Sequence, residues 1–180
     1  MGQEDADEAL VASCRSGNRA AFDALVARYE RPVFNVAFRM LGDPDAARDV
    51  AQAAFLKVLE NLHKFDPRYR FFSWLYKIAL NEVYDVLAYR ARQTELEDVH
   101  PADDDPLRDV TAADIGARVQ EALARLSPDH RAVLVLRHFS DLSYESIALA
   151  LDLPDQTVKS RLYEARERLR TWLAPATQEA

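Results

Sequence analysis

A short acidic segment divides this chain into two parts. Residues 93–117 carry eight acidic side chains and one basic one, and therefore account for the whole formal net charge of −7. The segment also contains Pro101, Pro106 and Gly116 and has no sustained apolar period, which is typical of a flexible linker whose charges repel one another. We therefore expect residues 93–117 to join two small domains, residues 1–92 and 118–180, and not to belong to a large multidomain enzyme.

Both parts show the periodicity of amphipathic helices. In the first part, apolar side chains recur at the spacing i, i+3, i+4, i+7: Phe22, Leu25, Val26 and Tyr29. Asp43 followed by Pro44 predicts a capped helix start, because proline is tolerated in the first turn of a helix. Alternating strand patterns and Asn-Gly or Asp-Gly turns are missing from the sequence. These observations predict an all-α fold of two small helical domains.

The helix that begins after Asp43 is apolar over more than half of its circumference. A helix that buries a single face needs a stripe of only about 100°. Two interpretations are open: the helix is surrounded by its own bundle, or its outer side binds a protein partner. In the second interpretation the binding side carries Asp49, Gln52, Phe55, Leu56 and Leu59.

A later segment mixes aromatic rings with cations. Seven of the 17 aromatic residues lie between Tyr69 and Tyr89, close to several Arg and Lys residues. This mixture suits single-stranded nucleic acid, because rings stack on bases while cations follow the phosphates. Ser73 is expected to cap a helix reaching about Arg92, with Trp74, Lys77, Asn81, Asp85 and Arg92 on one face. The alternative is that the rings are core residues and the charges a solvated rim.

The second part has the spacing of a helix-turn-helix. Ser143 is expected to cap one helix, and Asp155 a last helix that follows a tight connection at 152–154. The start of that last helix exposes side chains able to bind base edges and phosphates. They are Gln156, Thr157, Lys159, Ser160, Arg161 and, one turn further, Arg166. A helix-turn-helix that serves only packing is the alternative.

Little in the sequence indicates other chemistry. Apolar runs reach about five residues, whereas a membrane span needs about 20, and the acidic N-terminus is unlike a secretion signal. We therefore expect a cytoplasmic protein without membrane insertion. The single cysteine, Cys14, and the four histidines show no metal-ligand spacing, and no phosphate-binding glycine loop is present. We assign no metal, no cofactor and no enzymatic activity.

Two sets of motifs resemble those of bacterial sigma factors of the extracytoplasmic-function (ECF) group of the sigma-70 family. In the second part the set resembles the region that binds the promoter −35 element: Leu126-Ser127-Pro128, Leu142-Ser143-Tyr144-Glu145 and Thr157-Val158-Lys159-Ser160-Arg161-Leu162. In the first part the set resembles sigma region 2: Leu41-Gly42-Asp43, Asp49-Val50, Phe65-Asp66, Trp74-Leu75 and Asn81. The resemblance covers the chain apart from the acidic segment and the termini.

The resemblance implies a function for each surface. Residues 1–92 would form region 2, which binds core RNA polymerase, and residues 118–180 region 4, which reads the duplex −35 element. The polymerase contacts would be Asp49, Gln52, Phe55, Leu56 and Leu59. Recognition and melting of the −10 element would involve Arg70, Phe72, Trp74, Lys77, Asn81, Tyr84, Asp85 and Arg92. The −35 contacts would be Gln156, Thr157, Lys159, Ser160, Arg161 and Arg166.

The same resemblance implies that the protein is a specificity subunit of RNA polymerase and that an anti-sigma factor opposes it. A stand-alone helix-turn-helix regulator is the second hypothesis. A sensor domain needs neither an aromatic, basic helix face nor an apolar face next to it, so the first part favours a sigma factor.

Two positions and one short segment depart from the family pattern. Ala53 replaces a usual Glu, Gln156 replaces a common Gly, and residues 89–93 contain fewer arginines.

Overall fold

The computed structural model describes residues 3–94 and 112–173. Within these residues the chain forms helices and no strand, which confirms the predicted all-α class. The helices are α1 (Gln3–Arg15), α2 (Arg19–Leu41), α3 (Pro44–Asn61), the short 3-10 helix η1 (Leu62–Lys64), α4 (Phe71–Thr94), α5 (Ala112–Ala124), α6 (Pro128–Phe139), α7 (Tyr144–Leu151) and α8 (Asp155–Leu173). None of them is long and apolar enough to cross a membrane.

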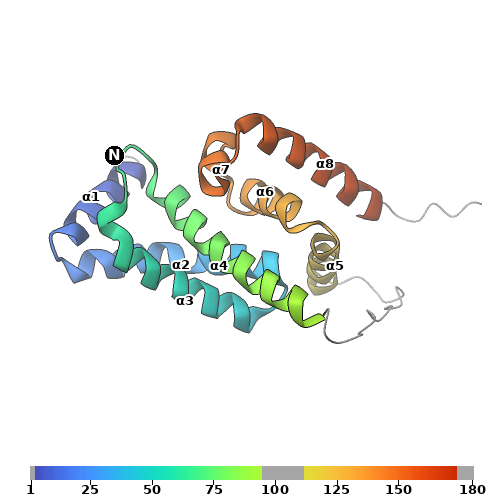
Figure 1. The fold of residues 1–180 in the computed structure, drawn as a ribbon, viewed down its shortest axis with the longest axis horizontal. Coiled ribbons are helices and arrows are strands. Elements are labelled where there is room, and N and C mark those ends of the chain that lie inside the picture. Colours follow the sequence, from blue (N-terminus) through green and yellow to red (C-terminus); the bar gives the residue numbers. More distant parts are fainter. Residues whose placement is uncertain (1–2, 95–111, 174–180) are drawn as a thin grey trace, which may run out of the picture.

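Helices α1 to α4 form the first bundle, which we call the N-terminal bundle. The long helices α2, α3 and α4 lie side by side, and α1 packs against one end of them (Figure 1). Their shared core is mainly apolar, with Leu25, Met40, Val58, Leu75 and Leu80 almost inaccessible to solvent. The buried carboxylate of Asp7 accepts hydrogen bonds from Arg28 and Tyr29 and so fixes α1 to α2.

The turn between α2 and α3 forms as the sequence predicts. The Asp43 carboxylate accepts hydrogen bonds from the backbone N–H groups of Asp45 and Ala46, at 3.0 and 3.1 Å. These bonds, with the nearby Arg90 guanidinium, hold the pKa of Asp43 below its usual value. Gly42 ends α2 with a φ of 70°, a left-handed conformation that costs glycine little. This turn sets the direction in which α3 returns along α2.

Helices α5 to α8 form the second, C-terminal bundle. Its centre is α6, whose residues 131–136 are all buried. Ser143 caps α7 as predicted, because its hydroxyl accepts a hydrogen bond from the Ser146 N–H at 3.2 Å. Asp152 then adopts a left-handed φ of 56° and directs the chain into α8. Helices α7 and α8 have the layout of a helix-turn-helix, which confirms that prediction.

Two predicted helix starts are wrong. α4 begins at Phe71, two residues before Ser73, because Phe71 packs into the core against Phe65. Ser73 therefore lies inside the helix, is 1% exposed, and has an Oγ with no hydrogen-bond partner. α8 already includes Asp155, because the Pro154 carbonyl accepts the first hydrogen bonds, from the N–H groups of Thr157 and Val158.

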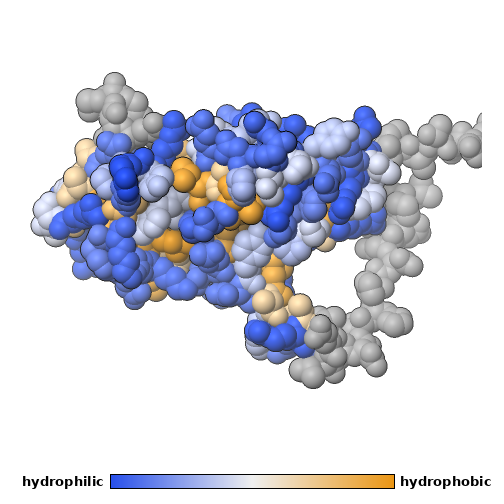
Figure 2. All heavy atoms as spheres, turned by 45° about the horizontal axis from the view of Figure 1, so that its top comes forward, coloured by the Kyte–Doolittle hydropathy of each residue, from blue (hydrophilic) through white to orange (hydrophobic). Residues whose placement is uncertain are grey.

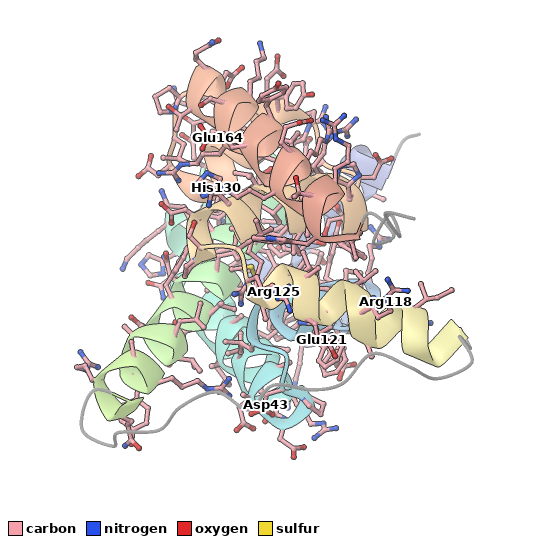
Figure 3. All side chains as sticks on the ribbon, turned by 90° about the vertical axis from the view of Figure 1, so that its right-hand side faces the viewer. Asp43, Arg118, Glu121, Arg125, His130 and Glu164 are labelled. Atoms are coloured by element: carbon pink, nitrogen blue, oxygen red, sulfur yellow. The ribbon has the colours of Figure 1, made fainter. Side chains whose placement is uncertain are left out.

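The predicted acidic linker lies mostly outside the described residues. Its first two residues, 93 and 94, belong to α4, and its last six, 112–117, belong to α5. α5 crosses the end of the N-terminal bundle, with Arg118 and Glu121 along its length and Arg125 directly after its last residue (Figure 3). The two bundles pack against each other, α4 against α7 and α2 against α5 and α6.

Candidate functional site

An apolar groove runs between α2 and α3. It encloses about 590 Å³, and its floor combines Phe22, Val26 and Phe34 of α2 with Ala51 and Phe55 of α3. The lining also includes Gln52 and Leu56 of α3, together with the charged residues Glu30 and Arg31 of α2 and Arg48 of α3. We call this the docking groove. Phe22 and Val26 belong to the stripe that the sequence places in the core, yet the structure leaves both only partly buried.

The polymerase contacts expected from the sequence do not all lie at the surface. Leu56 is 62% exposed and Leu59 52%, which is unusual for leucine, and Asp49 and Gln52 are exposed beside them. Phe55, in contrast, is only 7% exposed and belongs to the core. Its ring still contributes to the groove lining. The wide apolar arc of α3 thus has a side buried in its own bundle and a side exposed to solvent.

The aromatic residues at the start of α4 form one cluster. Trp74 packs against Phe65 and Phe71, with ring centroids 5.3 and 6.1 Å apart. Next to it, the Arg70 guanidinium lies 5.8 Å from the centre of the Phe72 ring. Phe71 is buried, whereas Phe72 and Trp74 stay partly exposed. Phe71 is therefore a core residue, whereas the rings of Phe72 and Trp74 remain accessible at the surface.

Beyond Trp74, α4 and α3 together border a small hollow of about 290 Å³. Asn81 and Asp85 of α4 face it, as the sequence predicts. The hollow also receives Lys57, Asn61 and Lys64 from α3 and η1, which the sequence analysis missed. Asn61 connects them, donating to the Lys57 carbonyl at 2.9 Å and accepting from Lys64 at 2.8 Å. The i, i+4, i+7 spacing of these three residues in the sequence could have predicted that they share one helix face.

Two of the predicted −10 residues contact the C-terminal bundle. The Lys77 ammonium lies 3.2 Å from an Asp152 carboxylate oxygen. The Tyr84 hydroxyl donates to Asp129 at 3.5 Å, and burial, with the negative charge of Asp129, raises the pKa of Tyr84 to about 12. Arg92, near the end of α4, is exposed. Arg90, one turn before the end, donates to the Leu41 carbonyl and to Asp43.

At the helix-turn-helix, cations gather around one tyrosine. The Lys159 ammonium and the Arg137 guanidinium lie 5.8 and 5.7 Å from the centre of the Tyr144 ring. Gln156, Lys159 and Ser160 are exposed on the same helix, and Thr157 is partly buried. Tyr144 and Arg137 were not among the predicted site residues, because only the folded bundle brings α6, α7 and α8 together.

Arg161 points away from this group. Its guanidinium forms an ion pair with Asp129 of α6, at 2.9 Å, and its side chain is 28% exposed. His130, next to Asp129, contacts Ser127 at 2.6 Å and Glu164 at 3.0 Å and so joins the start of α6 to α8 (Figure 3). In this arrangement Arg161 holds helices together and does not lie beside Lys159.

Arg166, the last predicted −35 residue, contacts a histidine. Its Nε donates to His138 Nε2 at 3.1 Å, which requires the neutral imidazole at that nitrogen. Partial burial, together with the Arg166 and Arg137 charges, lowers the pKa of His138. The folded protein thus resists protonation of His138 more than the unfolded chain does.

This contact predicts that mild acid destabilises the fold. Because the pKa of His138 is lowered on folding, the unfolded state takes up a proton first as the pH falls through about 6.5. We expect the urea midpoint to fall between pH 7.5 and 5.5, and to fall less in His138→Gln. The exposed His63→Gln is the control. An unchanged pH dependence in His138→Gln would contradict the role given to this contact.

The described residues therefore define a helical protein of two bundles, the second with a DNA-binding type of helix-turn-helix and the first with an apolar groove and an aromatic, basic helix face. The family profile "Sigma-70 region 2" matches residues 25–93, and "Sigma-70, region 4" matches residues 116–169. Over the full length of both chains, 35% of residues are identical to the RNA polymerase sigma-H factor of Pseudomonas aeruginosa. The chain belongs to the sigma-70 family of RNA polymerase sigma factors, in its ECF group.

Other relatives agree with this assignment. The ECF RNA polymerase sigma-E factor of Haemophilus influenzae is 30% identical over 97% of this chain and 99% of its own. Among solved structures, CnrH in complex with the cytosolic domain of CnrY has a TM-score of 0.74, 31% identity, and covers 93% of this chain and 97% of its own. The sigma factor RpoE of Bartonella quintana, in complex with the anti-sigma factor NepR, has a TM-score of 0.70, 25% identity, and covers 84% and 96%. Family membership favours the sigma-factor hypothesis over the stand-alone regulator.

Proposed function

We propose that this protein binds core RNA polymerase, directs it to promoters through two DNA elements, and helps to open the −10 element without itself being an enzyme. Residues 1–92 would carry the polymerase and −10 surfaces, residues 93–117 the connection, and residues 118–180 the −35 surface, all acting in the cytoplasm. The observation that carries this proposal is that three surfaces with different side-chain chemistry lie on three helices, α3, α4 and α8. Each surface has the kinds of side chain that its proposed ligand needs.

The docking groove fits a helical segment of the polymerase. Exposed leucines beside a preformed apolar groove are the usual features of a site that accepts an amphipathic helix. Leu56 and Leu59 lie one turn apart on α3 and would be the anchors. Asp49 and Gln52, exposed on the same helix, would supply polar contacts at the edge of the interface.

The α4 face fits an unpaired DNA strand. Phe72 and Trp74 offer partly exposed rings close to Arg70 and Lys77, and Arg92 lies near the other end of the same helix. A base that stacks on such a ring gains about 1–3 kcal/mol, whereas separating one base-pair step costs about 1.4 kcal/mol of stacking. Capture of two or three bases thus offsets much of the cost of opening, and no hydrolysis is needed. Asn81 and Asp85 would contact base edges from the neighbouring hollow.

The start of α8 fits the major groove of duplex DNA. Gln156, Lys159 and Ser160 are exposed there, in the part of a recognition helix that meets base edges. The Tyr144 ring would hold the Lys159 ammonium in place by a cation–π contact. Gln156, where the family commonly has glycine, adds an amide that can pair with adenine. Thr157, Arg161 and Arg166 would complete the −35 surface, and Arg161 must first leave Asp129.

An anti-sigma factor is the third proposed partner. The similar CnrH and RpoE chains were solved in complex with CnrY and with the anti-sigma factor NepR. A cleft of about 790 Å³ lies between the two bundles and is lined by Trp74 of α4 and by Leu149 and Leu153 near the end of α7. Such an antagonist would cover this cleft and the docking groove, because both expose apolar side chains.

Run-off transcription tests the proposed function. Purified protein is added to core polymerase and fragmented genomic DNA, and transcript starts are sequenced. We expect new starts that share two upstream elements. Lys159→Ala should reduce these transcripts about tenfold, because one base or phosphate contact is worth about 1–3 kcal/mol, and it should leave polymerase association unchanged.

Arg168→Ala, which removes another exposed cation of α8, is the matched control. Equal losses in both variants would contradict the assignment of Lys159 to the −35 surface. Tight binding of a specific duplex by the protein alone, at physiological salt, would instead favour the stand-alone regulator.

A further inference from the structure

We propose that Arg15, at the end of α1, is a positioning residue for the −10 strand: it fixes the connection between η1 and α4, and so places the Lys64 ammonium and the Trp74 ring for an unpaired strand. The proposal rests on the proposed function, since it assumes that the α4 face binds this strand. Arg15 itself would touch no DNA. The sequence carries no local signal for this role, because the partners of Arg15 lie 47 to 50 positions away.

The Arg15 guanidinium donates to three backbone carbonyls of one short segment. Its Nε donates to the Leu62 carbonyl at 3.2 Å, and its Nη2 donates to the carbonyls of His63 at 3.0 Å and Phe65 at 2.6 Å. Carbonyl groups at the end of a helix lack partners within that helix. α1 and this segment lie at the same end of the N-terminal bundle (Figure 1). The planar fork of the arginine thus completes the end of η1.

The rest of the connection to α4 is closed by its own hydrogen bonds. The Asp66 carboxylate accepts from the Arg68 N–H at 3.0 Å, and the Asp66 carbonyl accepts from the Tyr69 N–H at 3.1 Å. Hydrogen bonds from Arg68, with the charges of Arg68 and Arg15, lower the pKa of Asp66 to about 2. Asp66 therefore stays ionised, and the turn at 66–69 keeps its shape. Arg15 joins the start of this self-contained turn to α1.

The segment that Arg15 holds includes a cation that faces the expected strand. The residues before and after Lys64 are His63 and Phe65, and Arg15 binds the carbonyls of both. The backbone of Lys64 is thus restrained on both sides. Its ammonium donates to the Asn61 side chain at 2.8 Å and lies in the hollow between α3 and α4. Arg15 therefore helps to set where this cation would meet a phosphate.

Phe65 transmits the same restraint to the aromatic cluster of α4. Its ring is 3% exposed and packs against Phe71 and Trp74, with ring centroids 5.9 and 5.3 Å apart. Trp74 stays partly exposed and is a ring on which a base would stack. Lys64 and Trp74 both border the cleft between the bundles, where apolar surface is visible (Figure 2). A shift of the Phe65 backbone would therefore move the base-stacking ring.

This restraint matters because a loosely held site must be ordered when its ligand binds, and the ordering lowers affinity. Arg15 is exposed, so its replacement removes hydrogen bonds without leaving a cavity in the core. We expect the loss of these bonds to weaken capture of the strand about tenfold, which equals about 1.4 kcal/mol. That value is close to the cost of ordering the backbone of a single residue.

Two promoter templates test the proposal. Both carry a promoter mapped by run-off transcription, and in one of them the −10 region is mismatched so that its strands are already separated. Core polymerase is combined with the wild-type protein, Arg15→Met or the control Arg19→Met, which removes an exposed arginine at the start of α2. We expect Arg15→Met to lose about tenfold on the paired template and about twofold on the mismatched one. The difference arises because strand capture no longer has to offset base-pair separation there.

Arg15→Lys separates charge from geometry. Lysine keeps the positive charge but offers one compact ammonium in place of the planar fork, so it cannot bind the three carbonyls in the same arrangement. We expect Arg15→Lys to lose nearly as much as Arg15→Met on the paired template. Wild-type activity of Arg15→Lys would overturn the proposal, because the charge alone would then be sufficient.

A spectroscopic measurement follows the Trp74 ring itself. In a Trp172→Phe background Trp74 is the only indole of the chain, and quenching of its fluorescence by acrylamide measures its exposure. We expect Arg15→Met to increase the quenching, because the Phe65 ring no longer packs as firmly against the indole, and Arg19→Met to leave it unchanged. Unchanged quenching in Arg15→Met would overturn the link between Arg15 and this ring.

The remaining outcomes separate this proposal from the proposed function. Equal losses of Arg15→Met on both templates would overturn the positioning role, because a variant that only folds less well loses activity on each of them. Equal activity of Arg15→Met and the wild-type protein would also overturn it, while leaving the proposed function intact. If the wild-type protein gives no transcripts from either template, the proposed function is wrong, and this proposal with it.

Discussion

Leu56→Asp combined with Leu59→Asp is expected to abolish association with core polymerase. Both leucines are more than half exposed, so the substitutions leave the core intact. Each leucine that becomes buried on binding contributes about 1.5 kcal/mol or more, and two such losses weaken binding on the order of 100-fold. A carboxylate forced into the docking groove adds a desolvation cost. Co-purification of tagged protein with polymerase, followed by a fluorescence titration, measures the effect.

The structure also selects the controls for this experiment. Phe55 is unsuitable as a target, although the sequence places it on the same surface, because it is 7% exposed and its replacement by Asp would unfold the bundle. Ile115→Asp, on α5, removes an equally exposed apolar side chain from the other bundle and should leave polymerase binding unchanged. Circular dichroism verifies the fold of each variant. If the double variant still co-purifies with polymerase, the docking site lies elsewhere.

Arg131→Met is expected to lower the free energy of unfolding by about 3 kcal/mol, because it leaves buried carbonyls without donors. Arg131 is 8% exposed and donates to the carbonyls of Met40, Ala124 and Leu126. Burial lowers the pKa of its guanidinium, which shows the cost of placing this charge inside. Methionine keeps an unbranched apolar stem but supplies no donor. Urea unfolding followed by circular dichroism measures the change.

Arg125→Met is the matched control for Arg131. It removes an exposed arginine from the turn that follows α5, which is labelled in Figure 3, and should change stability by less than about 0.5 kcal/mol. If Arg131→Met lowers the free energy of unfolding by less than about 1 kcal/mol, water must replace the three hydrogen bonds. The guanidinium would then not be what holds α6 to the end of α2.

Local sequence patterns were sufficient for much of the fold. The caps at Asp43 and Ser143 formed as predicted, since an N-cap depends on residues two or three positions away. The apolar periods predicted the helices for the same reason. The start of α4 was misplaced because Phe71, and not the hydroxyl of Ser73, decides where that helix begins, and Phe71 does so by packing on Phe65.

The residues of the candidate site were only partly predictable from the sequence. Residues that share one helix face, such as Trp74, Asn81 and Asp85, were grouped correctly by helical spacing. Lys57, Asn61 and Lys64 were missed because they reach the same hollow from another helix. Tyr144 was missed for the same reason, since its two cations come from α6 and α8.

The sequence by itself determined the helical class, the division at the acidic segment, and the kinds of chemistry on α3, α4 and α8. These properties follow from short-range spacing, composition and motif order. Only the tertiary structure decided that Phe55 is buried while Leu56 is exposed, that Arg161 pairs with Asp129, and that Arg131 reaches the end of α2 across 91 positions of sequence. Such choices depend on which distant surfaces pack together, and a helical period cannot specify the partner that covers a face.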